Sequence, residues 1–348
     1  MLKATKKALL RSCETFGLSS SISGSAWRRG RLLILAYHGI SQEDEHLWAP
    51  ELYMPPAFFR ERLETIKRAR CNVLPLAEAL SKLYAGDLPE RCAVLTFDDG
   101  ASDFYTQALP ILQDYGYPAT VYLTTYYCDY NRPVFQGACS YILWKRRGAR
   151  LDLKAVTGEA PHYDLTTEAA GTAAFNAVVD FAERERLSAQ EKDELAARLA
   201  RAVGFDYEAM LAKQLVHILS PSRVKEMAER GVDIQLHTHR HRSPTDRAEL
   251  AREVEDNRRR IAALAGVQAE HLCYPDGLFH ADYLNWLPEM GVRSATTCEP
   301  GLASVNSHPM ALPRLVDTSL LSLTEFKGWL DGVSDFLPQR ARRAAASR

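Results

Sequence analysis

The sequence predicts an α/β fold built from parallel strand–helix units. Short apolar runs rich in strand-forming residues alternate along the chain with amphipathic segments at helical spacing, which is typical of parallel sheets. Two of these runs, residues 32–37 and 93–97, end in polar residues followed by glycine, as strands do where they turn into loops. The 348 residues suit one large domain or two small ones.

We expect residues 1–30 to be a basic arm and linker. Lys3, Lys6, Lys7 and Arg11 make the N-terminus basic. Residues 2–14 could therefore form a short amphipathic helix that lies on a membrane or on the folded domain, or a solvated arm. Residues 15–30 are rich in serine and glycine and then basic, which is typical of a linker. The apolar pair Leu9-Leu10 is too short for a secretory signal, which needs roughly 7–15 apolar residues.

Strands and helices alternate regularly up to residue 123. A strand over 32–38 ends at His38, and a mostly polar loop over 41–54 follows it. The spacing of apolar residues then predicts helix 55–70, strand 73–74, helix 76–84, strand 93–97, helix 104–115 and strand 119–123. This order implies that the strands run parallel to one another.

The alternation stops over residues 145–219, which are polar and mostly helical in pattern. Ser188 and Glu191 form a capping box that opens a helix, and Gly204 ends it. We interpret this span as an insertion that shapes a substrate groove or an interface. Beyond it the pattern predicts helix 220–230, strand 231–237, helix 243–265, strand 271–274, helix 323–330 and a disordered basic tail over 336–348.

Composition excludes several classes of protein. The net charge is −1 and no repeated basic–aromatic pattern is present, so nucleic acid is not an expected partner. The seven cysteines are odd in number and include no C-x-x-C pair, which argues against a disulfide framework and favours a reducing compartment. No apolar run is long enough to span a bilayer. We therefore expect a cytoplasmic location or the cytoplasmic face of the membrane, where the basic N-terminus could make peripheral contact.

Two carboxylates, Asp98 and Asp99, follow the buried strand 93–97 directly and precede Gly100. Asp-Asp-Gly is also common turn chemistry, so a turn is the simplest interpretation of these residues alone. Because neighbouring side chains of a strand point to opposite faces, two adjacent aspartates at a strand end can take different tasks. One can hold a metal while the other handles a proton.

A second polar strand end strengthens the metal interpretation. Residues 231–241 alternate apolar and polar side chains and finish in the run His237-Thr238-His239-Arg240-His241. Two histidines and one aspartate are the ligand types of an open catalytic zinc site, which keeps a fourth position for water.

These two stretches resemble the polysaccharide deacetylase family, also known as the NodB-homology or carbohydrate esterase 4 enzymes. That family carries a T-F-D-D-G motif and, downstream, an H-[S/T]-x-x-H motif. The chain matches the first motif at residues 96–100 and the second at residues 237–241, in the expected order. The resemblance implies a distorted (β/α) barrel of about seven strands over residues 31–335, interrupted by the insertion.

The resemblance also assigns tasks to individual residues. Asp99, His237 and His241 would hold a divalent metal, most simply Zn²⁺, although Co²⁺ and Ni²⁺ share this ligand set. Asp98 would act as the general base. The family has an L-x-x-H motif, normally near the C-terminus, whose histidine is the general acid. Residues 35–38 match it at the start of this chain and would make His38 the acid.

The third motif of the family departs from its usual form. Residues 271–277 match a strand followed by P-x-G, but Cys273 stands where the family carries an arginine that orients the catalytic aspartate. Arg314 is a replacement candidate, and a surface salt bridge is its alternative role. The fourth motif, of D-x-x-D-W type, is not visible. Thr238, Tyr274 and Pro275 are further candidates for supporting the site or binding substrate, and His239 could touch the metal, support the loop or simply lie on the surface.

The substrate implied by the resemblance is an N-acetylated, GlcNAc-containing polysaccharide or oligosaccharide. Aromatic residues after the strand 119–123 could stack on sugar rings or merely pack the loop, namely Tyr126, Tyr127, Tyr130 and Trp144. Two other functions stay open: a metal amidohydrolase on a small nitrogen compound, and a catalytically silent sugar-binding barrel. Glycoside hydrolysis is disfavoured, because adjacent aspartates are poorly placed to flank a sugar bond at the required separation of about 5 Å or more.

Overall fold

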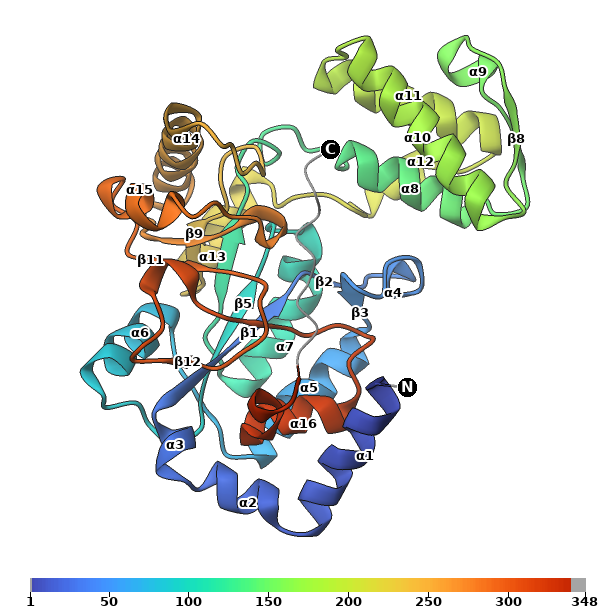
Figure 1. Ribbon diagram of the computed structural model, residues 1–348. Helices are drawn as coiled ribbons and strands as arrows, with labels where there is room; N and C mark the ends of the chain where they lie inside the picture. The colour runs from blue at the N-terminus through green and yellow to red at the C-terminus, as the bar shows by residue number, and fades with distance from the viewer. Residues whose placement is uncertain (1, 339–348) are drawn as a thin grey trace. The chain divides into compact units, whose positions relative to one another are not determined.

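The computed structural model describes residues 2–338 (Figure 1). The chain forms two compact units. The first, here called the barrel unit, joins the residues before 130 to those after 218, and the second, the insertion unit, comprises Tyr130–Ile218. The insertion therefore begins earlier than the predicted residue 145, because α8 (Phe135–Lys145) packs against α10 (Glu168–Arg184) and α11 (Ala189–Val203) of that unit.

A curled parallel sheet forms the centre of the barrel unit. Its neighbouring strands follow the order β11-β10-β9-β6-β5-β1, and β13 pairs with β1, all in parallel. The bounds are β1 Arg31–Tyr37, β5 Cys92–Phe97, β6 Thr120–Leu123, β9 Asp233–Leu236, β10 His271–Cys273, β11 Ser294–Thr296 and β13 Leu315–Val316. The short strand β4 (Asn72–Val73) pairs with β5 in parallel, and the short strand β12 (Ala303–Ser304) pairs with β1 in the antiparallel direction.

The two ends of the sheet are joined by a single segment, residues 312–316. Leu312 forms a parallel bridge with Thr296 at the end of β11, and Leu315 pairs with Leu35 of β1. This segment curls the sheet toward closure. The predicted α/β fold, a distorted barrel with about seven strands, is therefore confirmed.

Helices alternate with the strands as the apolar spacing predicts. They are α5 (Pro56–Arg68), α6 (Leu76–Ala85), α7 (Leu109–Tyr115), α13 (Pro221–Glu229), α14 (Arg247–Ala265), α15 (Tyr283–Glu289) and α16 (Leu323–Asp331). The predicted helix 104–115 begins with a π-helical turn over Phe104–Ala108. Helix α14 begins after residue 243 because Asp246 caps it, its side chain accepting the Glu249 N–H at 2.9 Å.

The expectation of a linker over residues 15–30 is wrong, whereas residues 2–14 do form a helix, which lies on the folded domain. Residues 2–29 form α1 (Leu2–Thr15), α2 (Leu18–Ser23) and α3 (Ala26–Arg29), and the first two pack against α16. Arg28 is fully buried and donates hydrogen bonds to the carbonyls of Leu330 and Arg31. The serine and glycine of this region end and cap helices, with Ser25 accepting the Arg28 N–H. Most of the predicted basic tail, residues 339–348, lies outside the described residues.

The insertion unit is mainly helical. Besides α8, α10 and α11 it contains α9 (Lys154–Thr157), α12 (Tyr207–Ala212) and a small antiparallel pair, β7 (Arg150–Asp152) with β8 (His162–Asp164). The predicted capping box of Ser188 and Glu191 opens α11, and Gly204 ends it in the left-handed conformation. The seven cysteines all lie within residues 2–338, where none of them forms a disulfide. Within residues 2–338, none of the helices has both the length and the apolar character to span a membrane.

A buried carboxyl group supports the short parallel pair of β2 (Gly39–Ile40) and β3 (Tyr53–Met54). Asp103 is 4 % exposed and accepts the Ile40 N–H at 3.0 Å. Burial raises the pKa of Asp103 to about 8, and the nearby Glu45 and Asp99 carboxylates act in the same direction. The folded protein therefore holds a proton here over a pH range in which the unfolded chain has released it.

We expect Asp103→Asn to stabilise the protein increasingly as pH rises. Between about pH 4 and pH 8 the folded wild type binds one proton more than the unfolded chain at Asp103, so its free energy of unfolding falls by up to about 1.4 kcal/mol per pH unit through this group. The amide removes that dependence. Urea unfolding at pH 5 and pH 8 measures it, with Asp114→Asn, at a surface ion pair, as control. An equal effect of Asp103→Asn at both pH values would contradict the assignment.

Candidate active site

The candidate site residues meet at the carboxyl ends of the parallel strands. Asp98 and Asp99 follow β5, His38 follows β1, and the loop of residues 237–241 follows β9. Arg314 directly precedes β13 in the segment that closes the sheet. Because the carboxyl ends of parallel strands share one edge of the sheet, residues far apart in sequence come together there.

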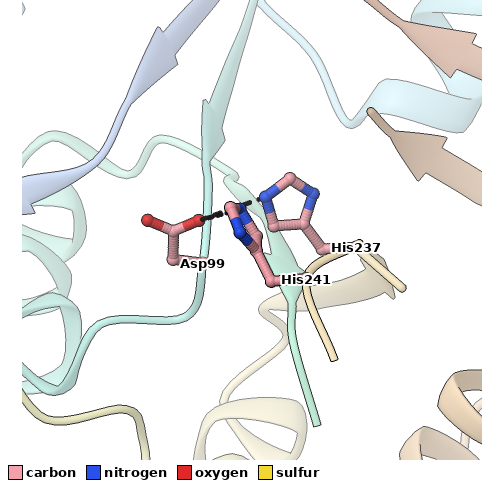
Figure 2. Close-up of side chains that lie close together, drawn as sticks. All are labelled: Asp99, His237 and His241. Carbon is pink, nitrogen blue, oxygen red and sulfur yellow. Dashed lines mark hydrogen bonds and ion pairs between the residues drawn. The ribbon is translucent and has the colours of Figure 1, made fainter. Parts of the chain in front are cut away.

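Asp99, His237 and His241 form a compact cluster (Figure 2). The Nε2 atoms of His237 and His241 lie 3.1 and 3.2 Å from the same oxygen, Oδ1 of Asp99. Their potential ligand atoms all lie within 4.8 Å of one another. The His237 side chain is 2 % exposed, whereas those of Asp99 and His241 are 35 % and 29 % exposed, so one side of the cluster is open to solvent.

The donor set of this cluster fits a divalent metal. Nδ1 of His237 lies 2.8 Å from the carbonyl oxygen of Cys273. Since a carbonyl only accepts hydrogen bonds, Nδ1 must donate, and Nε2 of the neutral ring is then left unprotonated and directed at Asp99. Hydrogen bonding of the distal ring nitrogen in this way is the usual device for orienting a metal-binding histidine. Asp99, His237 and His241 could therefore hold a metal together.

The backbone around the cluster adopts unusual conformations. Asp99, Thr238 and His241 have φ angles of 67°, 59° and 55°, in the left-handed region that non-glycine residues rarely occupy. Thr238 is β-branched, and its hydroxyl accepts the Arg242 N–H at 3.0 Å, which holds the turn. Gly100 has a φ of 77°, and a Cβ there would meet the Leu123 side chain at 2.3 Å. Such strain gathers where a loop must present side chains in one particular arrangement.

Asp98 and Arg314 form a buried, doubly hydrogen-bonded ion pair. The two terminal guanidinium nitrogens of Arg314 lie 2.7 and 2.8 Å from the two carboxylate oxygens of Asp98. Arg314 is fully buried, so the alternative of a surface salt bridge is wrong. It also donates to the Thr297 carbonyl and to the Cys273 thiol at 2.8 and 2.9 Å. The third motif has no arginine at Cys273, and the guanidinium beside Cys273 comes instead from Arg314, directly before β13.

This ion pair keeps Asp98 ionised. Burial alone raises the pKa of Asp98, but the positive charge and the hydrogen bonds of Arg314 outweigh it, so the pKa lies below its usual value. His38 faces the same carboxylate, with Nε2 3.8 Å from Oδ2 of Asp98 and a side chain 19 % exposed. An ionised carboxylate and an accessible imidazole therefore lie side by side.

The remaining candidates have other surroundings. Tyr274 is buried, its ring stacks on Phe279, and its hydroxyl donates to the Met310 carbonyl at 2.7 Å, while Pro275 is buried at the start of a short 3₁₀ turn. His239 is not part of the cluster, and its Nδ1 lies 2.9 Å from the Thr125 hydroxyl. Of the four predicted stacking aromatics, Tyr126 lies beside the histidine loop, its ring centroid 5.7 Å from that of His239.

One residue of this region was not found from the sequence. Asn257 is fully buried in α14 and accepts the His237 N–H at 2.9 Å. It lies between Val254 and Ile261 at helical spacing, on the buried face of α14, where most side chains are apolar. A polar residue on the apolar stripe of a helix is the signal that could have identified it, because buried polar groups require partners.

A curled parallel sheet with ionisable side chains gathered at its carboxyl edge defines a barrel enzyme. The family model described as polysaccharide deacetylase matches residues 85–295, more than half of the chain. The chain belongs to the polysaccharide deacetylase family. His38 and Arg314 lie outside the matched residues.

Individual relatives agree with this membership. YxkH of Bacillus subtilis, named as a polysaccharide deacetylase, is 21 % identical over 89 % of this chain and 81 % of its own. The poly-β-1,6-N-acetyl-D-glucosamine N-deacetylase of Escherichia coli is 29 % identical over 29 % of this chain and 15 % of its own. Among solved structures, the Streptococcus pyogenes deacetylase PplD in complex with acetate shares the fold with a TM-score of 0.55, at 20 % identity over 88 % of this chain and 99 % of its own.

We expect the chelator-treated protein to take up one Zn²⁺ per chain. Replacing a residue of the cluster, as in His237→Ala, should weaken the affinity for Zn²⁺ by more than about 100-fold, because one ligand and its hydrogen-bonded support are both lost. Calorimetric titration with Zn²⁺ measures the stoichiometry and affinity. The control is His162→Ala in the insertion unit, where the side chain is 80 % exposed. Equal zinc binding by both variants would rule out the cluster as the metal site.

Proposed function

We propose that the protein is a metal-dependent N-deacetylase of a GlcNAc-containing polysaccharide or oligosaccharide. The observation that carries this proposal is the pairing of Asp98 with Arg314 beside the cluster of Asp99, His237 and His241. It places an ionised carboxylate next to three potential metal ligands, and hydrolysis of an amide needs both. A silent sugar-binding barrel would not need a buried carboxylate held in its charged form.

Each residue has a task in this proposal. A divalent metal held by Asp99, His237 and His241 would polarise the acetyl carbonyl and lower the pKa of water. Asp98 accepts the proton of the attacking water as general base, and Arg314 keeps it ionised and fixes its direction. His38 donates a proton to the nitrogen of the departing sugar amine. The products are acetate and a sugar with a free amino group.

The substrate class rests on similarity and on the surroundings of the site. A poly-β-1,6-N-acetyl-D-glucosamine N-deacetylase is among the relatives, at 29 % identity over 101 residues. Tyr126 is 39 % exposed and stands against the histidine loop, where its ring could stack on a neighbouring sugar. Such a contact favours an extended substrate over a small nitrogen compound.

We expect the protein to release acetate from N-acetylglucosamine oligomers only when both the metal and Asp98 are present. Asp98→Asn should lower the rate by about 10²-fold or more, because the amide cannot accept the proton. Enzymatic measurement of acetate compares the wild type, the chelator-treated protein and the variant. Asp114→Asn, at a carboxylate 58 % exposed, serves as control and should retain activity.

The other outcomes of this assay separate the alternatives. Zinc binding without acetate release from any oligomer would instead favour a small amide or another acylated sugar as the substrate. Absence of both zinc binding and release would overturn the enzymatic function and favour the silent barrel. Release that persists in Asp98→Asn would remove Asp98 from the role of base.

A second prediction concerns pH. Without Arg314 the burial of Asp98 is no longer outweighed, so its pKa rises and the base is ionised only at higher pH. We expect the acid limb of kcat/KM to move to higher pH by about one unit or more in Arg314→Met. Arg314→Lys keeps a positive charge, so its acid limb should stay closer to that of the wild type. An unchanged acid limb in Arg314→Met would contradict this role of the arginine.

A further inference from the structure

Helix α14 holds the histidine loop through its backbone. Three N–H groups of the loop donate to two residues of this helix: His237 to Oδ1 of Asn257 at 2.9 Å, His239 to the main-chain carbonyl of Glu253 at 3.1 Å, and Arg240 to Oε2 of Glu253 at 2.7 Å. Asn257 and Glu253 are four residues apart, so both side chains leave the same face of α14. The loop is therefore held at three points. One is the first candidate ligand, His237, and the other two, His239 and Arg240, lie between His237 and His241.

The amide of Asn257 makes three hydrogen bonds, and both of its N–H groups are used. Its Nδ2 donates to the carbonyl of Leu123 and to the hydroxyl of Thr125, both at 2.9 Å, while Oδ1 accepts from His237. The Thr125 hydroxyl in turn lies 2.9 Å from Nδ1 of His239. One buried side chain thus ties the end of β6 to the end of β9 and to the loop that follows.

Stability of the helix alone does not explain these residues. Asn257 is fully buried on the apolar stripe of α14, where a hydrophobic side chain would pack without needing three partners. Glu253 is only 6 % exposed, and one of its carboxylate oxygens accepts a loop N–H while the other accepts the Arg240 guanidinium at 3.0 Å. Both side chains direct their polar atoms at the histidine loop.

We propose that Asn257 and Glu253 are positioning residues for the metal site: they fix the loop so that His237 and His241 converge on Asp99. This inference rests on the proposed function, because it assumes that the cluster binds a metal. Asn257 acts at His237, and Glu253 acts on the segment between the two histidines. Asn257 contacts His237 through the backbone N–H of that residue, and Glu253 accepts from the N–H groups of His239 and Arg240.

The test is the affinity of the chelator-treated full-length protein for Zn²⁺, measured by competition with a chromophoric chelator, together with the melting temperature of the metal-free protein. Asn257→Leu should weaken zinc binding by about 10- to 100-fold, as is typical when the groups that orient metal ligands are removed. Glu253→Ala should weaken it several-fold, since alanine preserves the helix while the Arg240 N–H loses its acceptor.

Two controls separate positioning from stability. Arg258 follows Asn257 in α14 and donates to the carbonyls of Ala269 and Met290, which lie outside the histidine loop. Arg258→Met removes these hydrogen bonds. Asp256→Ala removes the other carboxylate near the Arg240 guanidinium, 3.7 Å away, which accepts no loop N–H. Both should keep zinc affinity within about two-fold of the wild type even where their melting temperatures fall.

The outcomes discriminate between this inference and the proposed function. Zinc affinities of Asn257→Leu and Glu253→Ala equal to those of the controls would overturn the positioning role while leaving the metal site intact. If Asn257→Leu does not fold, the comparison of Glu253→Ala with Asp256→Ala decides alone. A wild type that binds no zinc would overturn the metal site and the positioning role together.

Discussion

The buried ion pair of Asp98 and Arg314 is the interaction on which the rest of the barrel unit depends. A lone carboxylate in this position would be costly to bury, so the guanidinium must arrive with good geometry. Arg314 can do so only because Leu312 is bridged to Thr296 and Leu315 is paired with Leu35, on either side of it. The same five residues, 312–316, thus close the sheet and keep Asp98 ionised.

The histidine loop shows how strain is balanced by hydrogen bonds. Left-handed backbone at Asp99, Thr238 and His241 is unfavourable for each residue, by about 1 kcal/mol or more. The fold offsets this locally, through the Thr238 hydroxyl and the partners supplied by α14. The surrounding elements therefore determine this conformation, against the local preference of its own residues.

The sequence was informative wherever the signal was local. The two strand ends at Asp98 and His237 were predicted from alternation and terminal polar residues, and the structure brings them together. Arg314 could be named only as a candidate, since its partner lies 216 residues away in the chain. Asn257 was missed because a polar residue on the buried stripe of a helix does not reveal which distant groups it binds. The packed helices of residues 18–29 were taken for a linker because serine and glycine also cap and end short helices.

In sequence the insertion unit lies between β6 and α13. The strands on either side of it, β6 and β9, pair directly with each other in the sheet. Its own ends are held together, because Pro133 forms a bridge with His217 and the Val134 N–H donates to Val216. A module closed at its base in this way can be lengthened, trimmed or exchanged during evolution at small entropic cost. Variation in this part of the protein is thereby uncoupled from the strands that carry the candidate site.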